Sequence, residues 1–354
     1  MDPDIINDTR LENGFRNVTF SKFQKSKAKQ ELLKCLCDNK IENACYWSAE
    51  FICAGHFLDL WDIIIFYYCK YIHAGNPKLP LYLVMRYENF TTILNNGSQN
   101  DVLALRNNKK IRRLFGEIIC ILCYSTRRHI YQDVKLNKTC EFDLTNISDR
   151  FKAPSIKYVE AIFKDDDPKE LFIPINELIF NLETKNVVEC CYWYEWILEY
   201  ETICKKKKKK CACPGRVYAP NNNQHDIVWI IWDVIFHYSK GNPVVDKIVN
   251  ALYRLFTIRY NPTFKRKRKY IVYFCFALLI EKMDYDVVIV SKTEEIEAII
   301  QKIDAIYREI KKNEIAPKTD YLYANLKKSN AEKTMEKIEL MNSRETQVSP
   351  TTPS

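Results

Sequence analysis

The chain of 354 residues contains few of the residues that break regular secondary structure, with only seven glycines and thirteen prolines. This number is too small for the many tight turns of a β-sandwich or a β-barrel. It also argues against a phosphate-binding loop built from glycine backbone. The composition therefore favours long helices and predicts an all-α protein.

The sequence also lacks a long apolar run. The segment 270–280, YIVYFCFALLI, ends at Glu281, and the aromatic segment 56–77 is interrupted by Asp59, Asp62 and Lys70. A membrane-spanning helix needs roughly 20 apolar residues, so no span is expected. The first fifteen residues, MDPDIINDTRLENGF, have no apolar signal core, so the protein is not expected to be secreted and its fourteen cysteines are expected to be reduced.

Motifs for nucleotide chemistry are missing as well: no dinucleotide fingerprint, phosphate loop or kinase signature is found. None of the five histidines has metalloprotease spacing. Cys120 and Cys123 have the Cys-x-x-Cys form of a redox pair but lie in the apolar run LFGEIICILCY, so buried thiols are predicted. A non-catalytic protein is favoured, and an enzyme of unknown reaction stays an alternative.

Instead, the chain repeats itself. Segment 30–47, QELLKCLCDNKIENACYW, aligns without a gap to segment 176–193, NELIFNLETKNVVECCYW. Two further pairs follow in the same order: LDLWDIIIFYYCKYIHAGNP (58–77) with IVWIIWDVIFHYSKGNP (227–243), and KIRRLFGEIIC (110–120) with KRKRKYIVYFC (265–275). Three matched pairs in one order predict an internal duplication.

Each unit is predicted to be a bundle of about five helices. In the first unit they are expected near 23–37, 42–54, 57–73, 77–95 and 108–125, and the connector to the second unit is expected to wrap the first. The isoleucine-rich pattern at 293–313 predicts one more amphipathic helix. The expected plan is a flexible N-terminus (1–22), unit 1 with its connector (23–150), unit 2 (151–290) with an exposed Lys- and Cys-rich insertion (204–226), a C-terminal helix (291–313) and a disordered tail (314–354).

The tripeptide Gly-Asn-Pro of both units is interpreted as helix punctuation. Gly75 is expected in the left-handed conformation that closes one helix, while Asn76 caps the next helix and Pro77 occupies its first position.

Repeated tryptophans and aspartates are expected to have structural roles. An aspartate on an apolar helix could serve acid–base chemistry, but a duplicated Trp-Asp pair is more simply explained if each carboxylate binds a basic residue or a backbone amide of its own unit. The residues concerned are Trp47, Trp61, Asp62, Trp193, Trp232 and Asp233.

The net charge of +9 is concentrated in short basic runs. In both units cations stand at the start of the last helix, where they oppose the helix dipole. Such groups can contact nucleic acid or an acidic partner, and the alternative is a solvated surface. The predicted contact residues are Lys109, Lys110, Arg112, Arg113, Lys205, Lys206, Lys207, Lys208, Lys209, Lys210, Lys265, Arg266, Lys267, Arg268 and Lys269.

One metal site is a weaker alternative. Cys204, Cys211, Cys213 and His225 surround the insertion, and neighbouring lysines are expected to lower the pKa values of the thiols. The spacing lacks a paired Cys-x-x-Cys, so free thiols are favoured and no cofactor other than zinc is suggested.

Three sequence blocks carry a resemblance: ACYWSAEFICAGHFLDLWDIIIFYYCKYIHAGNPKLPLYL, DDDPKELFIPINEL and WILEYETICKKKKKKCAC. They resemble a set of proteins from giant nucleocytoplasmic large DNA viruses of algae and protists. The resemblance implies a viral protein located in the host cytoplasm, the virus factory or the virion, and it implies no catalytic residues. The tandem five-helix plan is also similar to that of cyclins and of the core of transcription factor IIB, although the cyclin-box pattern is missing here and kinase activation is not expected.

The sequence thus predicts a non-catalytic helical scaffold or adaptor that acts in viral replication, transcription or assembly. A protein partner is expected, and nucleic acid or an acidic partner is expected to meet the basic segments. Direct nucleic-acid binding as the main role and a zinc-dependent or other enzyme are the alternatives. The oligomeric state is left open.

Overall fold

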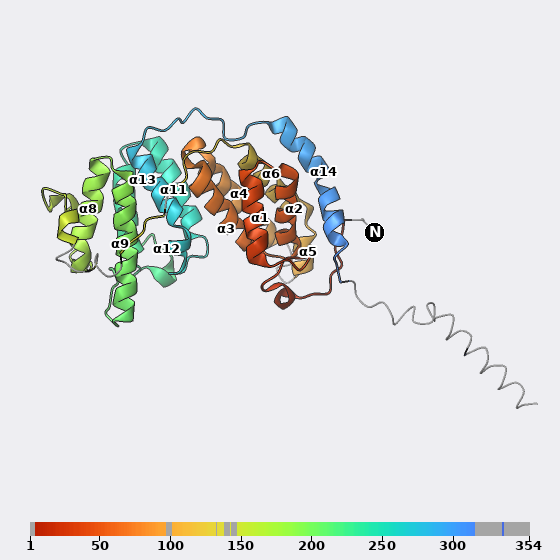
Figure 1. Cartoon of the computed structure of the whole chain (residues 1–354), viewed down its shortest axis with the longest axis horizontal. Helices are drawn as coiled ribbons and strands as arrows, with labels where there is room; N and C mark the ends of the chain where they lie inside the picture. The colour runs from red at the N-terminus through yellow and green to blue at the C-terminus, as the bar shows by residue number, and fades with distance from the viewer. Residues whose placement is uncertain are drawn as a thin grey trace, which may run out of the picture.

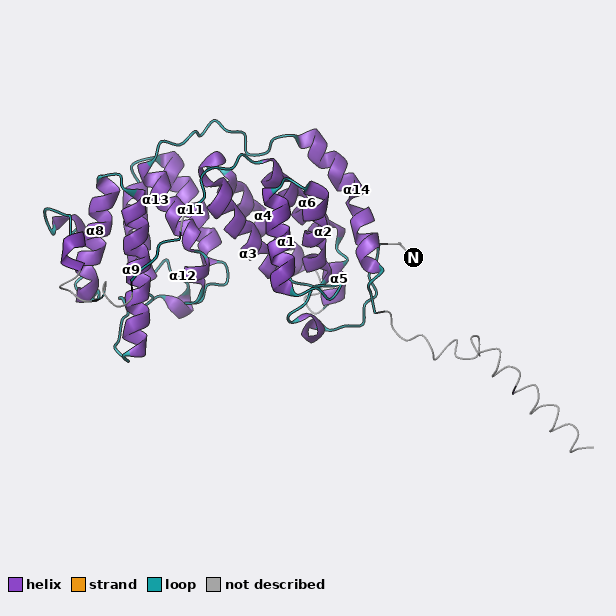
Figure 2. Cartoon of the chain, in the orientation of Figure 1, coloured by secondary structure: helices purple, strands orange, loops and turns teal. Residues whose placement is uncertain are grey.

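The computed structural model describes residues 4–96, 101–131, 133–137, 142, 147–315 and 335. Within these residues the fold is all-α, as the composition predicted, and contains no β-sheet (Figure 2). Every α-helix listed next lies in the described ranges: α1 Lys25–Cys37, α2 Ile41–Cys53, α3 Phe57–Tyr67, α4 Leu79–Asn96, α5 Val102–Arg106, α6 Lys109–Tyr124, α8 Phe172–Glu183, α9 Val187–Lys206, α10 Val228–Ser239, α11 Pro243–Thr257, α12 Phe264–Lys267, α13 Lys269–Ile280 and α14 Thr293–Lys311.

The helices form two groups that lie side by side (Figure 1). The first half contains α1 to α6, and the second half contains α8 to α13. Helix α4 packs against α11, and α3 packs against α13, so the two halves share an interface. The basic start of α13 therefore lies next to the first half.

Helices in the two halves follow the same order. In the first half α2 packs against α1 and α6, and in the second half α9 packs against α8 and α13. Helix α4 contacts α6 as α11 contacts α13. These pairings are the ones that a duplicated bundle requires, and the duplication itself stays a prediction.

The two Gly-Asn-Pro sequences behave differently. Asn242 caps α11 as predicted: its side chain accepts hydrogen bonds from the backbone amides of the second and third helical residues, and Pro243 occupies the first position. In the first half the prediction was wrong, because Gly75 lies in a short 3₁₀ turn and α4 begins only at Leu79. A Cβ atom on Gly75 would stand 1.9 Å from the Thr126 carbonyl oxygen, so glycine is needed there for a close backbone approach.

The aromatic helices form the core. Trp61, Trp193 and Trp232 are fully buried, whereas Trp47 is half-buried at the edge of the same core. Helix α3 ends in a π-helical turn, Tyr68–Ile72, whose Tyr68 and Cys69 are also buried. No helix of the described residues is both long and apolar enough to cross a membrane.

The C-terminal helix α14 leaves the second half and packs on α2 and α6 of the first (Figure 1). Its Ile303 Cδ1 occupies the space that a Cβ atom on Gly116 would need, at 2.3 Å from that position. The preceding segment is held on the way, because Asn76 Nδ2 donates to the Ile289 carbonyl at 3.0 Å. The sequence predicted this helix but not its docking site.

The expectation of a flexible N-terminus is wrong for residues 4–22. Ile6, Phe15 and Phe20 are fully buried, and the Thr9 amide donates to the Ile315 carbonyl at 3.1 Å. The N-terminal segment therefore pairs with the chain that follows α14. The tail predicted to be disordered, 314–354, lies outside the described residues apart from 314, 315 and 335.

The connector contacts the first half at its start, where Arg127 Nη1 donates to the Leu36 carbonyl at 3.0 Å, but the expectation that it wraps the first unit is wrong for its later part. Phe151 stacks on Trp193 with ring centroids 6.2 Å apart, and the backbone amides of Lys152 and Ala153 donate to the Glu177 carboxylate. The second part of the connector thus covers α8 and α9 of the second half.

Candidate functional site

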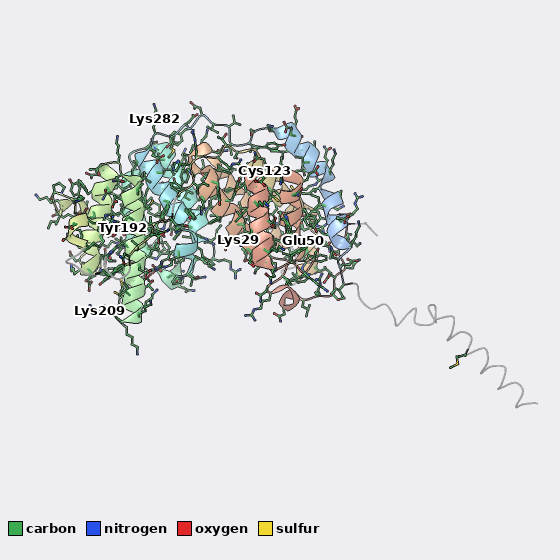
Figure 3. All side chains as sticks on the ribbon, viewed as in Figure 1. Lys29, Glu50, Cys123, Tyr192, Lys209 and Lys282 are labelled. Carbon is green, nitrogen blue, oxygen red and sulfur yellow. The ribbon has the colours of Figure 1, made fainter. Side chains whose placement is uncertain are left out.

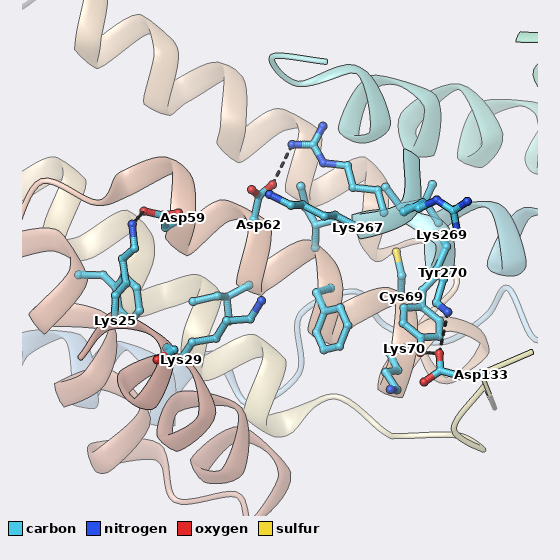
Figure 4. A pocket seen from close by; sticks show the side chains of 18 residues that line it. Lys25, Lys29, Asp59, Asp62, Cys69, Lys70, Asp133, Lys267, Lys269 and Tyr270 are labelled. Atoms are coloured by element: carbon cyan, nitrogen blue, oxygen red, sulfur yellow. Dashed lines mark hydrogen bonds and ion pairs between the residues drawn. The ribbon is translucent and has the colours of Figure 1, made fainter. Parts of the chain in front are cut away.

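A cleft of about 670 Å³ lies between the two halves (Figure 4). We call it the inter-half cleft. Its first wall is formed by α1 and α3 with the π turn after α3, and its second wall is formed by α12 and the start of α13. Its lining residues are Lys25, Ser26, Lys29, Phe51, Asp59, Asp62, Ile63, Ile65, Phe66, Cys69, Lys70, Asp133, Arg266, Lys267, Arg268, Lys269, Tyr270 and Ile271.

Helical spacing explains why the polar residues of the first wall meet there. Lys25 and Lys29 stand four residues apart on α1, and Asp59 and Asp62 stand three apart on α3. Residues with these separations share one face of a helix. Lys70 continues the same face of α3 into the π turn.

Three ion pairs neutralise the acidic residues of the cleft. Lys25 Nζ lies 2.9 Å from Asp59 Oδ2, Arg268 Nη2 lies 2.8 Å from Asp62 Oδ1, and Lys269 Nζ lies 2.7 Å from Asp133 Oδ1 (Figure 4). Seven basic and only three acidic residues line the cleft, so positive charge remains in excess.

Lys269 and the Tyr270 hydroxyl both donate to Asp133, and these bonds lower the pKa of its carboxyl group. The carboxylate is therefore charged at neutral pH and accepts the Tyr270 hydroxyl at 2.5 Å. Burial, with the bond to Asp133 as the next cause, raises the pKa of Tyr270. Tyr270 thus serves as a neutral hydrogen-bond donor and as a wall of the cleft.

The excess charge resides on Lys29, Lys70 and Lys267, which we call the cleft lysines. None of them has a carboxylate partner within 4.0 Å among the described residues. Each ammonium group instead lies near an aromatic ring: Lys29 Nζ is 5.4 Å from the centroid of Phe66, Lys70 Nζ is 4.8 Å from that of Tyr270, and Lys267 Nζ is 5.4 Å from that of Phe264. These distances permit cation–π attraction, which leaves the charge available to an incoming anion.

A second hollow of about 830 Å³ continues the cleft beyond Asp59 and Asp62. It adds Arg16 and Arg259 to the basic residues of the wall. The positively charged surface is therefore longer than the inter-half cleft alone.

Three predicted contact residues are buried in the fold, which corrects their assignment. Arg112 is 1% exposed and donates to the carbonyls of Arg106 and Asp4 at 3.0 and 3.1 Å. Lys265 is enclosed between Glu201 at 2.5 Å and Asp226 at 2.7 Å.

Arg268 is the third of them and donates to the carbonyls of Phe256 and Ile258, both at 2.7 Å. A charged group that is this deeply buried is stable only if hydrogen bonds or ion pairs within the fold satisfy it. They are therefore unavailable to an external ligand.

The other predicted basic residues are exposed, except Lys269, which is half-buried and paired with Asp133 and Glu195. Lys109, Lys110 and Arg113 lie at the exposed start of α6 and line neither hollow. The run 205–210 lies at the far end of α9, where Lys209 projects from the molecule (Figure 3). Of the predicted contact residues, only those of segment 266–269 line the cleft. They meet there Lys25, Lys29 and Lys70, which sequence reasoning missed.

The rest of the insertion is anchored to the second half by Arg216, although Val217 is 94% exposed and Tyr218 is also exposed. Arg216 is buried and binds Asp167 at 2.9 Å and Asp233 at 2.7 Å. The hydroxyl of Tyr218 donates to the other oxygen of Asp233 at 2.7 Å. Asp233 therefore binds a basic residue of its own unit, as predicted, whereas Asp62 binds Arg268 of the other half.

The four proposed zinc ligands do not form one cluster, although Cys204 and Cys211 are hydrogen-bonded neighbours. Cys213 Sγ points at the Asp226 carbonyl, 3.2 Å away, and His225 Nδ1 lies 3.0 Å from the Cys213 carbonyl. Burial raises the pKa of Cys211 and that of Cys213 to about 12, which corrects the expected lowering by the lysines. Across the described ranges no group of three or more His, Cys, Asp or Glu side chains has a metal-binding arrangement.

Cys120 and Cys123 are buried in α6, where sequence reasoning placed them as apolar thiols.

Comparison of the chain with family models, curated proteins and solved structures finds no match.

Proposed function

We propose that the protein is a non-catalytic helical scaffold that binds nucleic acid through the inter-half cleft. The observation that carries this proposal is the set of cleft lysines: three cations from α1, the π turn and α12 line one cleft, and none has a carboxylate partner among the described residues. Lysines that neutralise phosphates release condensed counterions, so such a cleft attracts a nucleic-acid backbone.

The aromatic rings of the cleft support the same ligand. Phe66 is half-buried in the wall, with its ring centroid 5.6 Å from that of Tyr270. Positively charged grooves that track a phosphate backbone commonly combine lysines with aromatic side chains. An acidic protein surface could pair with the lysines of the cleft, but it has no bases to stack on the aromatic rings.

Binding to a fluorescent oligonucleotide over a salt series tests the proposal. The variant Lys29→Gln, Lys70→Gln, Lys267→Gln removes three charges from the cleft without changing side-chain length much. Each lost phosphate contact reduces the slope of log affinity against log salt by about 0.7 for a single strand, so a decrease of about 2 is expected.

The matched control removes three exposed lysines that line neither hollow: Lys157→Gln, Lys247→Gln, Lys302→Gln. Both variants have the same net charge, so general electrostatic attraction changes equally in both. The proposal is wrong if the control loses as much affinity as the cleft variant, or if the parent protein does not bind at low salt.

The viral setting is a separate part of the proposal and is supported by the sequence resemblance alone. We propose a role in replication, transcription or assembly with a protein partner, in the host cytoplasm, the virus factory or the virion. Affinity capture from infected cells, followed by mass spectrometry, tests it, and recovery of only the protein itself would count against the adaptor role.

A further inference from the structure

The two basic runs that are 60 residues apart in the sequence meet in the structure at Glu201 of α9. Lys205 Nζ lies 2.8 Å from one oxygen of this carboxylate, and Lys265 Nζ lies 2.5 Å from the other. Glu201 is buried at 5% exposure, so it holds both lysine segments in fixed positions. The start of the exposed run 205–210 is therefore anchored next to α12.

Arg266 connects the Glu201 anchor on α9 with the inter-half cleft. Its Nη2 donates to Glu199 Oε2 at 2.9 Å and to Thr202 Oγ1 at 2.8 Å, both on α9. The side chain of Arg266 is nevertheless 44% exposed. It lines the inter-half cleft together with Lys267, so it belongs to both surfaces.

The distance from this bridge to the lysine run is short. Helix α9 continues from Thr202 to Lys206, which at 1.5 Å per residue is about 6 Å. All six lysines of the run 205–210 are exposed, and Lys208 has a left-handed backbone (φ 55°) that turns the chain back at the tip. Basic side chains thus follow one another from the cleft lysines past Arg266 to the end of α9.

The size of the cleft restricts what can enter it. A volume of about 670 Å³ lies in the range of small-ligand pockets of roughly 300–1,000 Å³. A cleft of this volume can hold a short piece of one strand and is too small to enclose a duplex segment.

We propose that the cleft and the lysine run 205–210 form one continuous track for a single nucleic-acid strand, with part of the strand in the cleft and its extension along the end of α9. This inference rests on the proposed function and adds to it the strand class and a second contact region. A strand that only fills the cleft would gain nothing from the lysine run, whereas a longer strand would contact both.

Oligothymidylates of two lengths, about 4 and about 16 nucleotides, separate these cases because single-strand sites of comparable domains span this range. The full chain is titrated with each at low salt, and so is the variant in which all six lysines 205–210 are replaced by glutamine. We expect this variant to lose about tenfold or more in affinity for the long strand and to bind the short strand within about twofold of the parent.

Four controls make the outcomes distinct. The cleft variant should lose affinity for both lengths, while the variant Lys157→Gln, Lys247→Gln, Lys302→Gln should change neither length selectively. Circular dichroism melting should show only a small decrease in the lysine-run variant, since its residues are exposed and Glu201 keeps its ion pair with Lys265 after Lys205 is replaced. A duplex of about 16 base pairs should bind more weakly than the long single strand.

The track is refuted if the lysine-run variant loses equally on both lengths, or if the long strand binds no better than the short one. A preference for duplex would refute the single-strand assignment. The proposed function fails in a different way, namely if the cleft variant binds both lengths as well as the parent.

Discussion

Substitution of Arg268 measures how much one contact between the two halves contributes to the free energy of unfolding. Its side chain is 6% exposed and donates three hydrogen bonds: two to the carbonyls of Phe256 and Ile258 in its own half and one to Asp62 in the other half. The guanidinium also lies 4.5 Å from the centroid of the Phe264 ring. Arg268→Met keeps an unbranched apolar stem and removes all three hydrogen bonds.

The expected loss follows from these contacts. Each buried carbonyl that loses its donor costs about 1–3 kcal/mol, so the carbonyls of Phe256 and Ile258 together account for most of the loss. We expect Arg268→Met to lower the free energy of unfolding by about 3–5 kcal/mol. Asp62→Asn should cost only about 0.5–1 kcal/mol, because Asp62 is 37% exposed and its amide oxygen still accepts a hydrogen bond.

Urea unfolding followed by circular dichroism and by tryptophan fluorescence measures both variants and the double variant. Agreement of the two probes checks that the halves unfold together. The double-mutant cycle should give a coupling energy of about 0.5–1 kcal/mol. A loss in Asp62→Asn as large as that in Arg268→Met would refute the reasoning, because the contact between the halves would then hold Arg268 more strongly than its own carbonyl partners.

Two further predictions concern the turn between α3 and α4. Burial lowers the pKa of His73 from 6.5 to about 4, so at pH 5 the unfolded chain binds a proton that the folded side chain does not. The free energy of unfolding should therefore fall by about 2 kcal/mol between pH 8 and pH 5. Urea titrations at the two pH values measure this change, and His73→Phe should remove it. Gly75→Ala places its Cβ against the Thr126 carbonyl and should lower the free energy of unfolding by about 1–3 kcal/mol. The matched variant Gly241→Ala has open space around its Cβ and should be neutral or slightly stabilising. Equal losses of stability at both glycines would contradict this account.

Much of the helical plan could be predicted because it depends on neighbours in the sequence. Asn242 and Pro243 start α11 through contacts within one turn. The isoleucines of α14 show their apolar face by spacing alone, and the observed helix, Thr293–Lys311, lies within the predicted 293–313. Local dihedral preferences and amphipathic spacing suffice for such elements.

The candidate site was only half predictable. Segment 265–269 stood out as a basic run, but Lys29, at the end of the stretch KSKAK, and Lys70, in the π turn after α3, carry no signal of their own. They enter the site because the first half packs on the second. The same packing buries Lys265 and Arg268, which look like surface cations in the sequence.

Composition and residue spacing were enough to predict that the chain is helical, where most helices begin and which faces are apolar, since these properties follow from residues three or four positions apart. Which charges are available depends instead on tertiary packing. Asp62 and Arg268 are 206 residues apart and pair across the halves, while Glu201 binds lysines from two separate runs. A cation is neutralised only where packing brings an acidic group within about 4 Å, and the local sequence does not determine that distance.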